Sequence, residues 1–234
     1  MRGVEIACRG RSLALADIAL PLDLESLAPG DAPWDLDVGF GKGRYLLRRA
    51  VEEPPVRLLG IEMAARYFQL VKQRSERRGL GNVVLLLGEA LYVMSAILPA
   101  ARFQAAHVYF PDPWPKDRHH KRRLFDHDTV DLLLALLVPG GRIFFATDHL
   151  DYGALVAELL ETHPALAVER REDWSEGART NYEVKYVREG RAILRLEATL
   201  RPGMPLVHPA GVDDLVMGVR AGAPAVEAVG VVAE

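Results

Sequence analysis

Cysteine is nearly absent from this chain of 234 residues, which contains only Cys8. A single cysteine excludes a disulfide within the chain and a thiolate metal cluster, and it is typical of proteins from a reducing compartment. The chain also lacks an apolar run long enough to span a bilayer, and charged residues interrupt the apolar pieces near its start, so we expect no signal peptide. These absences predict a soluble cytoplasmic protein without a membrane contact.

A large excess of one charge is also missing, because 29 Lys and Arg residues face 32 Asp and Glu residues, for a net charge of −3. Such a balance gives no overall attraction to nucleic acid, so any site for a polyanion must be a local patch. No internal repeat is evident. Hydrophobic residues make up 50% of the chain, which is enough for one domain with a substantial core.

Short apolar runs alternate with helical patterns from about residue 34 onward. The runs cover 34–40, 56–63, 82–89, 105–112 and 141–148, and the helical patterns cover 43–53, 64–79, 90–98, 126–138 and 150–162. Runs that are apolar without alternation are typical of strands buried on both faces of a parallel sheet. The pattern therefore predicts an α/β fold with a mostly parallel, doubly wound sheet and right-handed crossovers.

Two later runs, 182–189 and 192–199, alternate in polarity and are joined by Gly190 and Arg191. This pattern predicts an antiparallel C-terminal hairpin at the edge of the sheet. We accordingly divide the chain into a short N-terminal segment (1–33), a main domain (34–200) and a C-terminal extension (201–234) of unknown role.

The first predicted strand ends in "DVGFGKGR", which places Gly39, Gly41 and Gly43 at the edge where open α/β sheets bind their ligands. Glycines there allow a tight turn and a close approach of the backbone to a ligand. Arg44 stands where a dinucleotide fingerprint requires its third glycine. A nicotinamide cofactor is therefore disfavoured.

Acids mark the ends of the first three predicted strands: Asp37, Glu62 and Glu89. Asp37 would repel a pyrophosphate but suits the ammonium of an amino acid, Glu62 suits ribose hydroxyls, and Glu89 can accept from an exocyclic amine. Each acid taken alone is more typical of a solvated strand end than of a ligand site. Together on one edge they favour S-adenosylmethionine over a phosphorylated cofactor.

The stretch "YFPDPWPKDRHHKRR" (109–123) follows the fourth predicted strand. Pro111 and Pro113 restrict the backbone on either side of Asp112, and Trp114 offers a face on which a base could stack. A cationic patch then follows, made of Lys116, Arg118, His119, His120, Lys121, Arg122 and Arg123. Such a patch beside the cofactor edge indicates a polyanionic substrate, whereas the adjacent histidines lack a third ligand that would favour a metal site.

These motifs occur in a fixed order: "DVGFGKG", "GIEM", "FPDPWPKDRHHKRRL", "ATD" and "TNYE". In that order they closely resemble the bacterial tRNA (guanine-N7)-methyltransferases, which modify guanosine 46 in the variable loop. The resemblance implies a Rossmann-like class I methyltransferase fold, S-adenosyl-L-methionine as cofactor and tRNA as partner. We also expect a monomer or a homodimer that needs no metal and no membrane.

The resemblance assigns roles to particular residues of this sequence. Its cofactor contacts are Asp37, Gly39, Gly41, Glu62, Glu89 and Asp112, and Asp112 also has the catalytic role. Its substrate and RNA contacts are Lys116, Arg118, His119, His120, Lys121, Arg122, Arg123, Asp148, Thr180, Asn181, Tyr182 and Glu183. Three positions depart from the family pattern, because the family usually has Glu at Asp37, Asp at Glu89 and Lys at Asn181.

The chemistry of guanine N7 limits what these residues must do. N7 has an exposed lone pair and needs no deprotonation, so positioning and charge stabilisation are the main requirements. Asp112 or Asp148 is expected to orient the base, and Lys116 to hold a phosphate or the base oxygen. Two alternatives stay open: a methyltransferase of small molecules and a non-catalytic RNA-binding protein; a hydride-transferring oxidoreductase is the weakest.

Overall fold

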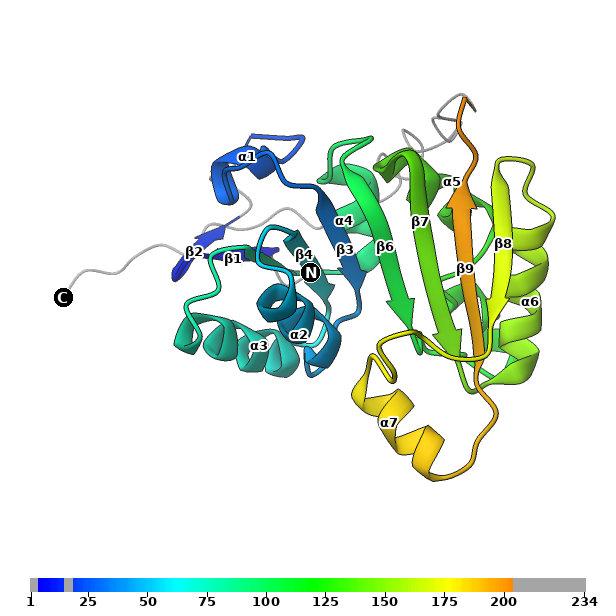
Figure 1. Cartoon of the computed structure of the whole chain (residues 1–234). Helices are drawn as coiled ribbons and strands as arrows, with labels where there is room; N and C mark the ends of the chain where they lie inside the picture. Colours follow the sequence, from blue (N-terminus) through cyan, green and yellow to red (C-terminus); the bar gives the residue numbers. More distant parts are fainter. Residues whose placement is uncertain (1–3, 15–18, 204–234) are drawn as a thin grey trace.

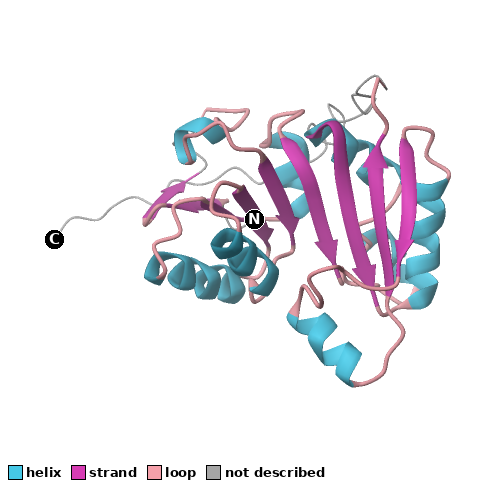
Figure 2. Ribbon diagram, in the orientation of Figure 1, coloured by secondary structure: helices cyan, strands magenta, loops and turns pink. Residues whose placement is uncertain are grey.

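The computed structural model describes residues 4–14 and 19–203, and within them it forms one nine-stranded sheet between two layers of helices (Figures 1 and 2). The strands are β1 (Glu5–Cys8), β2 (Arg11–Ala14), β3 (Trp34–Val38), β4 (Arg57–Glu62), β5 (Val83–Leu87), β6 (Phe103–Tyr109), β7 (Leu137–Thr147), β8 (Leu166–Arg171) and β9 (Leu194–Leu200). The helices are α1 (Leu24–Leu27), α2 (Arg44–Glu52), α3 (Ala65–Arg77), α4 (Ala90–Ala96), the 3₁₀ helix η2 (Asp117–Arg122), α5 (His127–Leu136), α6 (Leu150–Glu161) and α7 (Asn181–Arg188).

The strand order is β2-β1-β5-β4-β3-β6-β7-β9-β8. The five central strands, β3 to β7, pair in parallel, which confirms the predicted doubly wound sheet. From β3 the chain first continues to β4 and β5 on one side and later to β6 and β7 on the other. The order therefore reverses between β3 and β6, and the carboxyl ends of these two strands flank the position where such sheets bind ligands.

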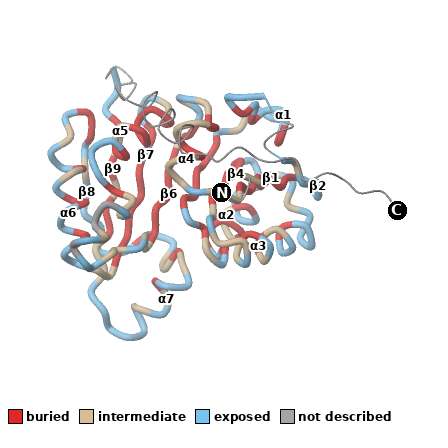
Figure 3. Tube along the Cα trace, turned by 180° about the vertical axis from the view of Figure 1, so that it is seen from behind, coloured by how far each residue is buried: buried red, intermediate tan, exposed pale blue. Residues whose placement is uncertain are grey.

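The central strands are buried on both faces, as their unbroken apolar runs predict (Figure 3). In β4, Leu58 packs with Leu46 and Phe68 of α2 and α3, whereas the next residue, Leu59, packs on the opposite face with the layer formed by α4, α5 and α6. Successive side chains of a strand point to opposite faces, so the two helix layers divide these residues between them.

The prediction that residues 182–189 form a strand is wrong, because this segment is the helix α7. Thr180 caps the helix by accepting the N–H of Glu183 at 3.0 Å, and the pair has the spacing of a capping box, the signal that the alternating polarity concealed. Antiparallel strands are present at the C-terminal edge, as the fold prediction states. The antiparallel neighbour of β9 at that edge is β8, a segment that the sequence analysis left unassigned.

The N-terminal segment forms strands that the sequence analysis did not predict. β1 and β2 form a hairpin, and β1 pairs antiparallel with β5. The turn between them contains Arg9 and Gly10, with φ of 47° and 72°. Two residues with positive φ are typical of the two-residue hairpin turn whose twist matches that of the flanking strands. Within the proposed C-terminal extension, residues 204–234 lie outside the described residues.

Candidate active site

The glycine turn after β3 is held by the end of β4. The backbone N–H of Gly41 donates to Oε2 of Glu62 at 2.8 Å, and the N–H of Ala64 donates to Oε1 at 2.8 Å. Gly43 has a φ of 71°, and a Cβ at this position would lie 2.6 Å from Cγ2 of Val71. The turn therefore needs glycine at position 43 for two reasons, its left-handed backbone and its contact with α3.

Asp37 is buried, with 3% of its surface exposed, and no described residue donates a hydrogen bond to its carboxylate. Burial raises the pKa of Asp37 to about 8, and the negative charges of Glu62 and Asp35 add to the shift. A buried carboxylate with acidic neighbours is most readily stabilised by a cation. The environment of Asp37 thus favours a bound ammonium or sulfonium group over a phosphate.

Asp37 opens into a cavity of about 210 Å³ that joins segments far apart in the sequence. Gly39 and Gly41 line it from the glycine turn, and α7 contributes Thr180 and Asn181. The remaining lining residues are Phe40, Lys42, Arg44, Tyr45, Tyr67, Tyr109, Phe110, Tyr182 and Lys185. The lining residues thus come from the carboxyl ends of β3 and β6 and from α7. Figure 1 shows α7 near the carboxyl ends of the central strands.

Several lining residues were missed by the sequence analysis. Lys42 and Arg44 are exposed and lie inside the quoted glycine motif, so their position in the motif was an available signal. No pattern in the sequence marks Tyr45, Tyr67 or Tyr109, because only the tertiary structure turns these three rings toward the cavity.

Glu89 is exposed and acts as the N-cap of α4, where its carboxylate accepts the N–H groups of Leu91 and Tyr92 at 3.1 and 2.8 Å. It is not among the residues that line the cavity with Asp37. The structure therefore gives Glu89 a local role in starting a helix, and a cofactor contact from it stays a prediction.

Asp112 lies three residues beyond the end of β6 and is exposed. The backbone on both sides of it is unusual, because Phe110 and Trp114 have φ of 53° and 41°. Non-glycine residues with positive φ are uncommon and persist where the surrounding structure fixes them. The bend at Phe110 directs the chain away from the sheet and carries Asp112 past the strand end.

The cationic patch includes the short helix η2, and two of its side chains contact Trp114 of the same segment. The guanidinium of Arg122 lies 5.1 Å from the ring centre of Trp114, and His119 contacts the same ring edge-on at 5.6 Å. Nε of Arg123 donates to the carbonyl oxygen of Pro113 at 2.8 Å. Trp114 is thus engaged by its own segment, which disfavours the interpretation that it offers a free face to a base.

The other patch residues divide into two groups. Lys116 and Arg118 are exposed, as the predicted contact with RNA requires. The predicted contacts His120 and Lys121 have side chains that lie outside the described part of the structure.

Asp148 and Glu183, two predicted substrate contacts, are both paired within the protein. Asp148 accepts from Nη1 of Arg191 at 3.0 Å and stays partly exposed. Glu183 is fully buried, and its carboxylate accepts Nε of Arg195 and the backbone N–H of Arg179, each at 2.7 Å. The structure therefore gives Glu183 a role in holding the start of α7, and a direct substrate contact from it stays a prediction.

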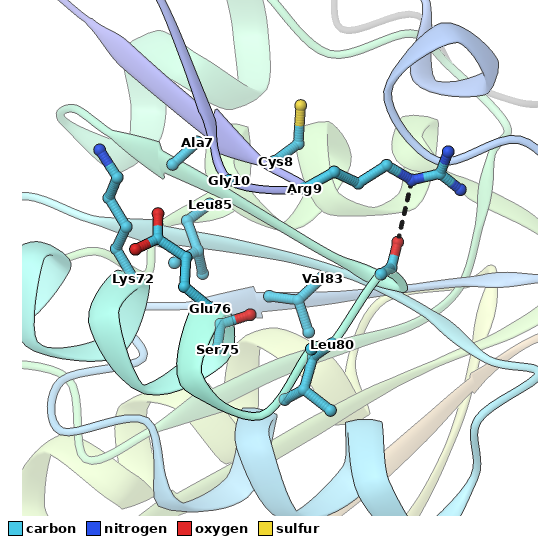
Figure 4. Close-up of a pocket in the computed structure, with 12 residues that line it drawn as sticks. Ala7, Cys8, Arg9, Gly10, Lys72, Ser75, Glu76, Leu80, Val83 and Leu85 are labelled. Carbon is cyan, nitrogen blue, oxygen red and sulfur yellow. Dashed lines mark hydrogen bonds between the residues drawn. The ribbon is translucent and has the colours of Figure 1, made fainter.

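A second hollow, of about 410 Å³, lies between the β1–β2 hairpin and α3 (Figure 4). Cys8 and Lys72 line it, and Arg9 donates to the carbonyl oxygen of Gly81 at 3.4 Å across its mouth. Burial raises the pKa of the Cys8 thiol, which lowers its reactivity. The hollow shares no residue with the cavity that contains Asp37, so we do not regard it as the active site.

Two further findings concern the described residues alone. They contain no cluster of three or more His, Cys, Asp or Glu side chains arranged to hold a metal ion. In that same part of the chain, no helix combines the length and the apolar character needed to cross a membrane.

Comparison with known proteins agrees with this geometry. Residues 31–196 match the family described as "Putative methyltransferase". The chain is similar in fold to the crystal structure of the 16S rRNA methyltransferase KamB, with a TM-score of 0.57 and 16% sequence identity, covering 85% of this chain and 100% of that one. At this level of identity the likeness shows the fold, and it confirms the Rossmann-like methyltransferase architecture.

Relatives with higher sequence identity to this chain share one protein name. The chain is 40% identical over 146 residues to the tRNA (guanine-N(7)-)-methyltransferase of Nocardia farcinica, covering 62% of this chain but only 54% of that relative. It is 36% identical over 165 residues to the protein of the same name from Alkalilimnicola ehrlichii, covering 70% of each. The chain thus spans about half the length of the first relative and over two thirds of the second. With its glycine turn, its buried Asp37 and its strand-end Asp112 in the family's order, the chain belongs to the tRNA (guanine-N7)-methyltransferase family.

Proposed function

We propose that this protein transfers a methyl group from S-adenosylmethionine to N7 of guanosine 46 in the variable loop of tRNA. The observation that carries the proposal is the buried carboxylate of Asp37, which has no described partner and faces the cavity at the switch point of the sheet. In this proposal the protein acts in the cytoplasm, without a metal, as a monomer or a homodimer.

The residues of the cavity fit S-adenosylmethionine. Asp37 offers an acceptor to a cationic group, and Gly39 and Gly41 leave room for the ligand because a Cβ is absent at both positions. Glu62 is not among the residues that line the cavity, but it holds the glycine turn that does. Each of its carboxylate oxygens accepts one backbone N–H and keeps a second lone pair, which suits a ribose hydroxyl. When bound, S-adenosylmethionine would supply a methyl group on a positively charged sulfur, and transfer of this group to guanine N7 would leave the sulfur as a neutral thioether.

Asp112 is proposed as the catalytic residue that meets the target base. Its exposed position beyond β6 lets its carboxylate accept from the N1–H and the exocyclic amine of guanine. The same negative charge offsets the positive charge that the purine gains on methylation. Asp148 is the alternative for this role, but its pairing with Arg191 makes it the less available acceptor.

The exposed cations of the 116–123 segment are proposed to contact tRNA phosphates. Lys116 and Arg118 stand free of the sheet, only a few residues from Asp112. Neutralisation of phosphates by Lys and Arg supplies most of the sequence-independent affinity for nucleic acid. Thr180, Asn181 and Tyr182 line the cavity from α7 and are proposed to contact the substrate there.

The test offers S-adenosylmethionine with a labelled methyl group and unmodified tRNA to the purified protein. One tRNA has guanosine at position 46 and its matched control has adenosine, and the product is mapped by aniline cleavage at N7-methylguanosine. We expect label and cleavage only with guanosine. Asp112→Asn should lower kcat by about two orders of magnitude, the usual effect of removing one transition-state contact, while calorimetry measures separately any loss of its predicted cofactor contact.

Other results would point to the other functions. Label without cleavage at N7 would keep a methyltransferase and reject this target. Turnover of a small molecule that is insensitive to salt would favour the small-molecule enzyme, which has no use for the cationic patch. A folded protein that binds tRNA but neither binds S-adenosylmethionine nor transfers label would be an RNA-binding module.

A further inference from the structure

Helix α7 contributes to the candidate site but buries little apolar surface. Glu183 is its only buried residue, whereas Tyr182 and Val187 are each 53% exposed. The helix lies against the carboxyl ends of the strands, apart from both helix layers (Figure 1). An amphipathic helix normally owes its stability to an apolar face packed on the core. The aromatic contacts of α7 with the strand end are those of Tyr182 and Tyr186 with Phe110, at ring-centre distances of 6.2 and 5.6 Å, so the helix depends on further anchors.

The first anchor is the buried ion pair between Glu183 and Arg195 of β9. Nε of Arg195 donates to Glu183 at 2.7 Å, and Nη1 of the same residue donates to the carbonyl oxygen of Glu172 at 2.7 Å. The other carboxylate oxygen of Glu183 accepts the backbone N–H of Arg179 at 2.7 Å. This anchor fixes the backbone at the start of α7 but reaches no residue of the cavity wall on the sheet.

The second anchor is the side chain of Arg179, the residue immediately before the helix cap. Its guanidinium lies over four aromatic rings, 4.1 Å from the centre of Trp174, 4.6 Å from Phe144, 5.6 Å from Tyr45 and 5.8 Å from Tyr109. Only 8% of the residue is exposed. A cation over aromatic faces is attracted by the negative charge at the ring centre, most strongly when it is shielded from water.

The guanidinium also forms hydrogen bonds inside this aromatic box. Nη1 of Arg179 donates to the hydroxyl of Tyr109 at 2.6 Å, and Nε donates to Glu176 at 2.5 Å. The Tyr109 hydroxyl lies 2.9 Å from Nδ1 of His107, whose Nε2 lies 3.0 Å from the hydroxyl of Tyr45. Arg179 therefore ends a buried polar chain that crosses the face of β6 to α2.

Tyr45 and Tyr109 take part both in the lining of the cavity and in the aromatic box around Arg179. Both rings line the cavity that contains Asp37, and both contact the Arg179 guanidinium from behind that cavity. Tyr109 is also the last residue of β6, directly before the bend that leads to Asp112. Arg179 thus connects the two walls of the cavity, α7 on one side and the strand end on the other.

We infer that Arg179 is a positioning residue that docks α7 against the end of β6 and thereby fixes the wall of the ligand site formed by Thr180, Asn181 and Tyr182. The identity of the ligand rests on the proposed function, but the docking itself does not. Arg179 is not among the residues that line the cavity. Its effect reaches the site through Tyr109 and through the backbone of the helix cap.

The test compares Arg179→Met with Arg171→Met, a matched control. Arg171 loses the same charge but lies on β8, where it is exposed and paired with Glu169 and Glu197. Hydrogen exchange of the α7 amides (181–188) and of the central strands is measured together with the Kd for S-adenosylhomocysteine, kcat and KM. Tyr109→Phe is the second variant, since it removes only the hydroxyl and keeps the ring in place.

With Arg179→Met we expect α7 to exchange about tenfold faster or more while the central strands stay protected, because local opening is decoupled from global unfolding. The Kd and the KM for cofactor should rise by about tenfold, a larger change than that in kcat. Tyr109→Phe should give the same pattern at smaller size, and Arg171→Met none of it. Arg179→Lys should restore little of the protection of α7 or of the cofactor affinity, because an ammonium lacks the planar fork that reaches both Tyr109 and Glu176.

Unchanged exchange in α7 for both Arg179→Met and Tyr109→Phe would overturn the inference. So would an equal loss of protection in α7 and the central strands, which would make Arg179 an ordinary stabilising residue. A wild-type protein that methylates no tRNA while Arg179→Met still loosens α7 would refute the proposed function and leave the docking role intact.

Discussion

The carboxylate of Glu62 accepts the backbone N–H of Gly41 and that of Ala64, both at 2.8 Å. This arrangement ties the glycine turn after β3 to the start of α3, so the end of β4 holds the floor of the candidate site. The residue expected to bind ribose is therefore also the residue that shapes the turn on which the ligand rests.

Changing Glu62 to Gln should weaken both functions. The amide keeps one oxygen acceptor but presents an NH₂ to the second backbone donor, so one charge-assisted hydrogen bond is lost, a cost of about 1.5–3 kcal/mol. Urea unfolding should show this loss, and calorimetry should show weaker binding of S-adenosylhomocysteine. Glu53→Gln, an exposed acid outside the turn, is the control and should change neither value by much. Equal behaviour of the two variants would contradict the role of Glu62.

The raised pKa of Asp37 predicts how stability depends on pH. Burial and the negative charges of Glu62 and Asp35 raise this pKa from 3.8 to about 8, so between these values the folded protein holds a proton that the unfolded chain has lost. The folded state binds more protons, and the free energy of unfolding therefore falls as pH rises through this window. Asp37→Asn should flatten that part of the curve, measured by urea unfolding from pH 5 to 8. An unchanged slope would show that Asp37 does not titrate there.

The same group should link cofactor binding to proton release. A bound cation favours the charged carboxylate and lowers its pKa, so S-adenosylmethionine should bind more tightly as pH rises toward 8. Calorimetry in two buffers of different ionisation enthalpy should detect the released proton. Asp37→Asn should bind more weakly and release none. Proton release that persists in this variant would assign the effect to another group.

Gly43→Ala tests the contact between the glycine turn and α3. The new methyl group would lie 2.6 Å from Cγ2 of Val71, at a backbone φ of 71°. Gly79→Ala is the matched control, because its φ is 63° and its Cβ would meet nothing within 4 Å. Both should lose about 1–2 kcal/mol to the left-handed backbone, and Gly43→Ala about 1–3 kcal/mol more to overpacking, by urea unfolding. Adding Val71→Ala should recover part of that excess, whereas equal losses at the two glycines would refute the steric argument.

The cationic patch should show itself in the salt dependence of tRNA binding. Arg118→Ala should lower the slope of log K against log salt by about one unit for each phosphate that the arginine neutralises. Arg170→Ala removes the same charge from a surface pair with Glu161 at the far edge of the sheet, and it should leave the slope unchanged. Fluorescence anisotropy at several salt concentrations measures both. The same slope for the two variants would place the RNA elsewhere on the surface.

The sequence by itself determined the central fold and most of the ligand edge. Unbroken apolar runs are typical of strands buried on both faces, and their alternation with helical patterns indicates a parallel sheet between two helix layers. The runs 34–40 and 105–112 overlap β3 and β6 accordingly. Asp37, Gly39 and Gly41 could be assigned to the ligand edge because the carboxyl ends of parallel strands meet at one edge of a sheet. Such regularities are local and periodic, so they can be recognised in a single sequence.

Only the tertiary structure decided where α7 lies and what its residues do. Its alternating polarity imitates a strand, and the capping pair Thr180 and Glu183, together with the partner Arg195, makes it a helix. Glu183 is buried, although its motif predicted a substrate contact. Arg179 reaches Tyr109 across 70 residues of sequence. Contacts of this kind depend on the three-dimensional approach of distant segments, for which the sequence contains no periodic signal.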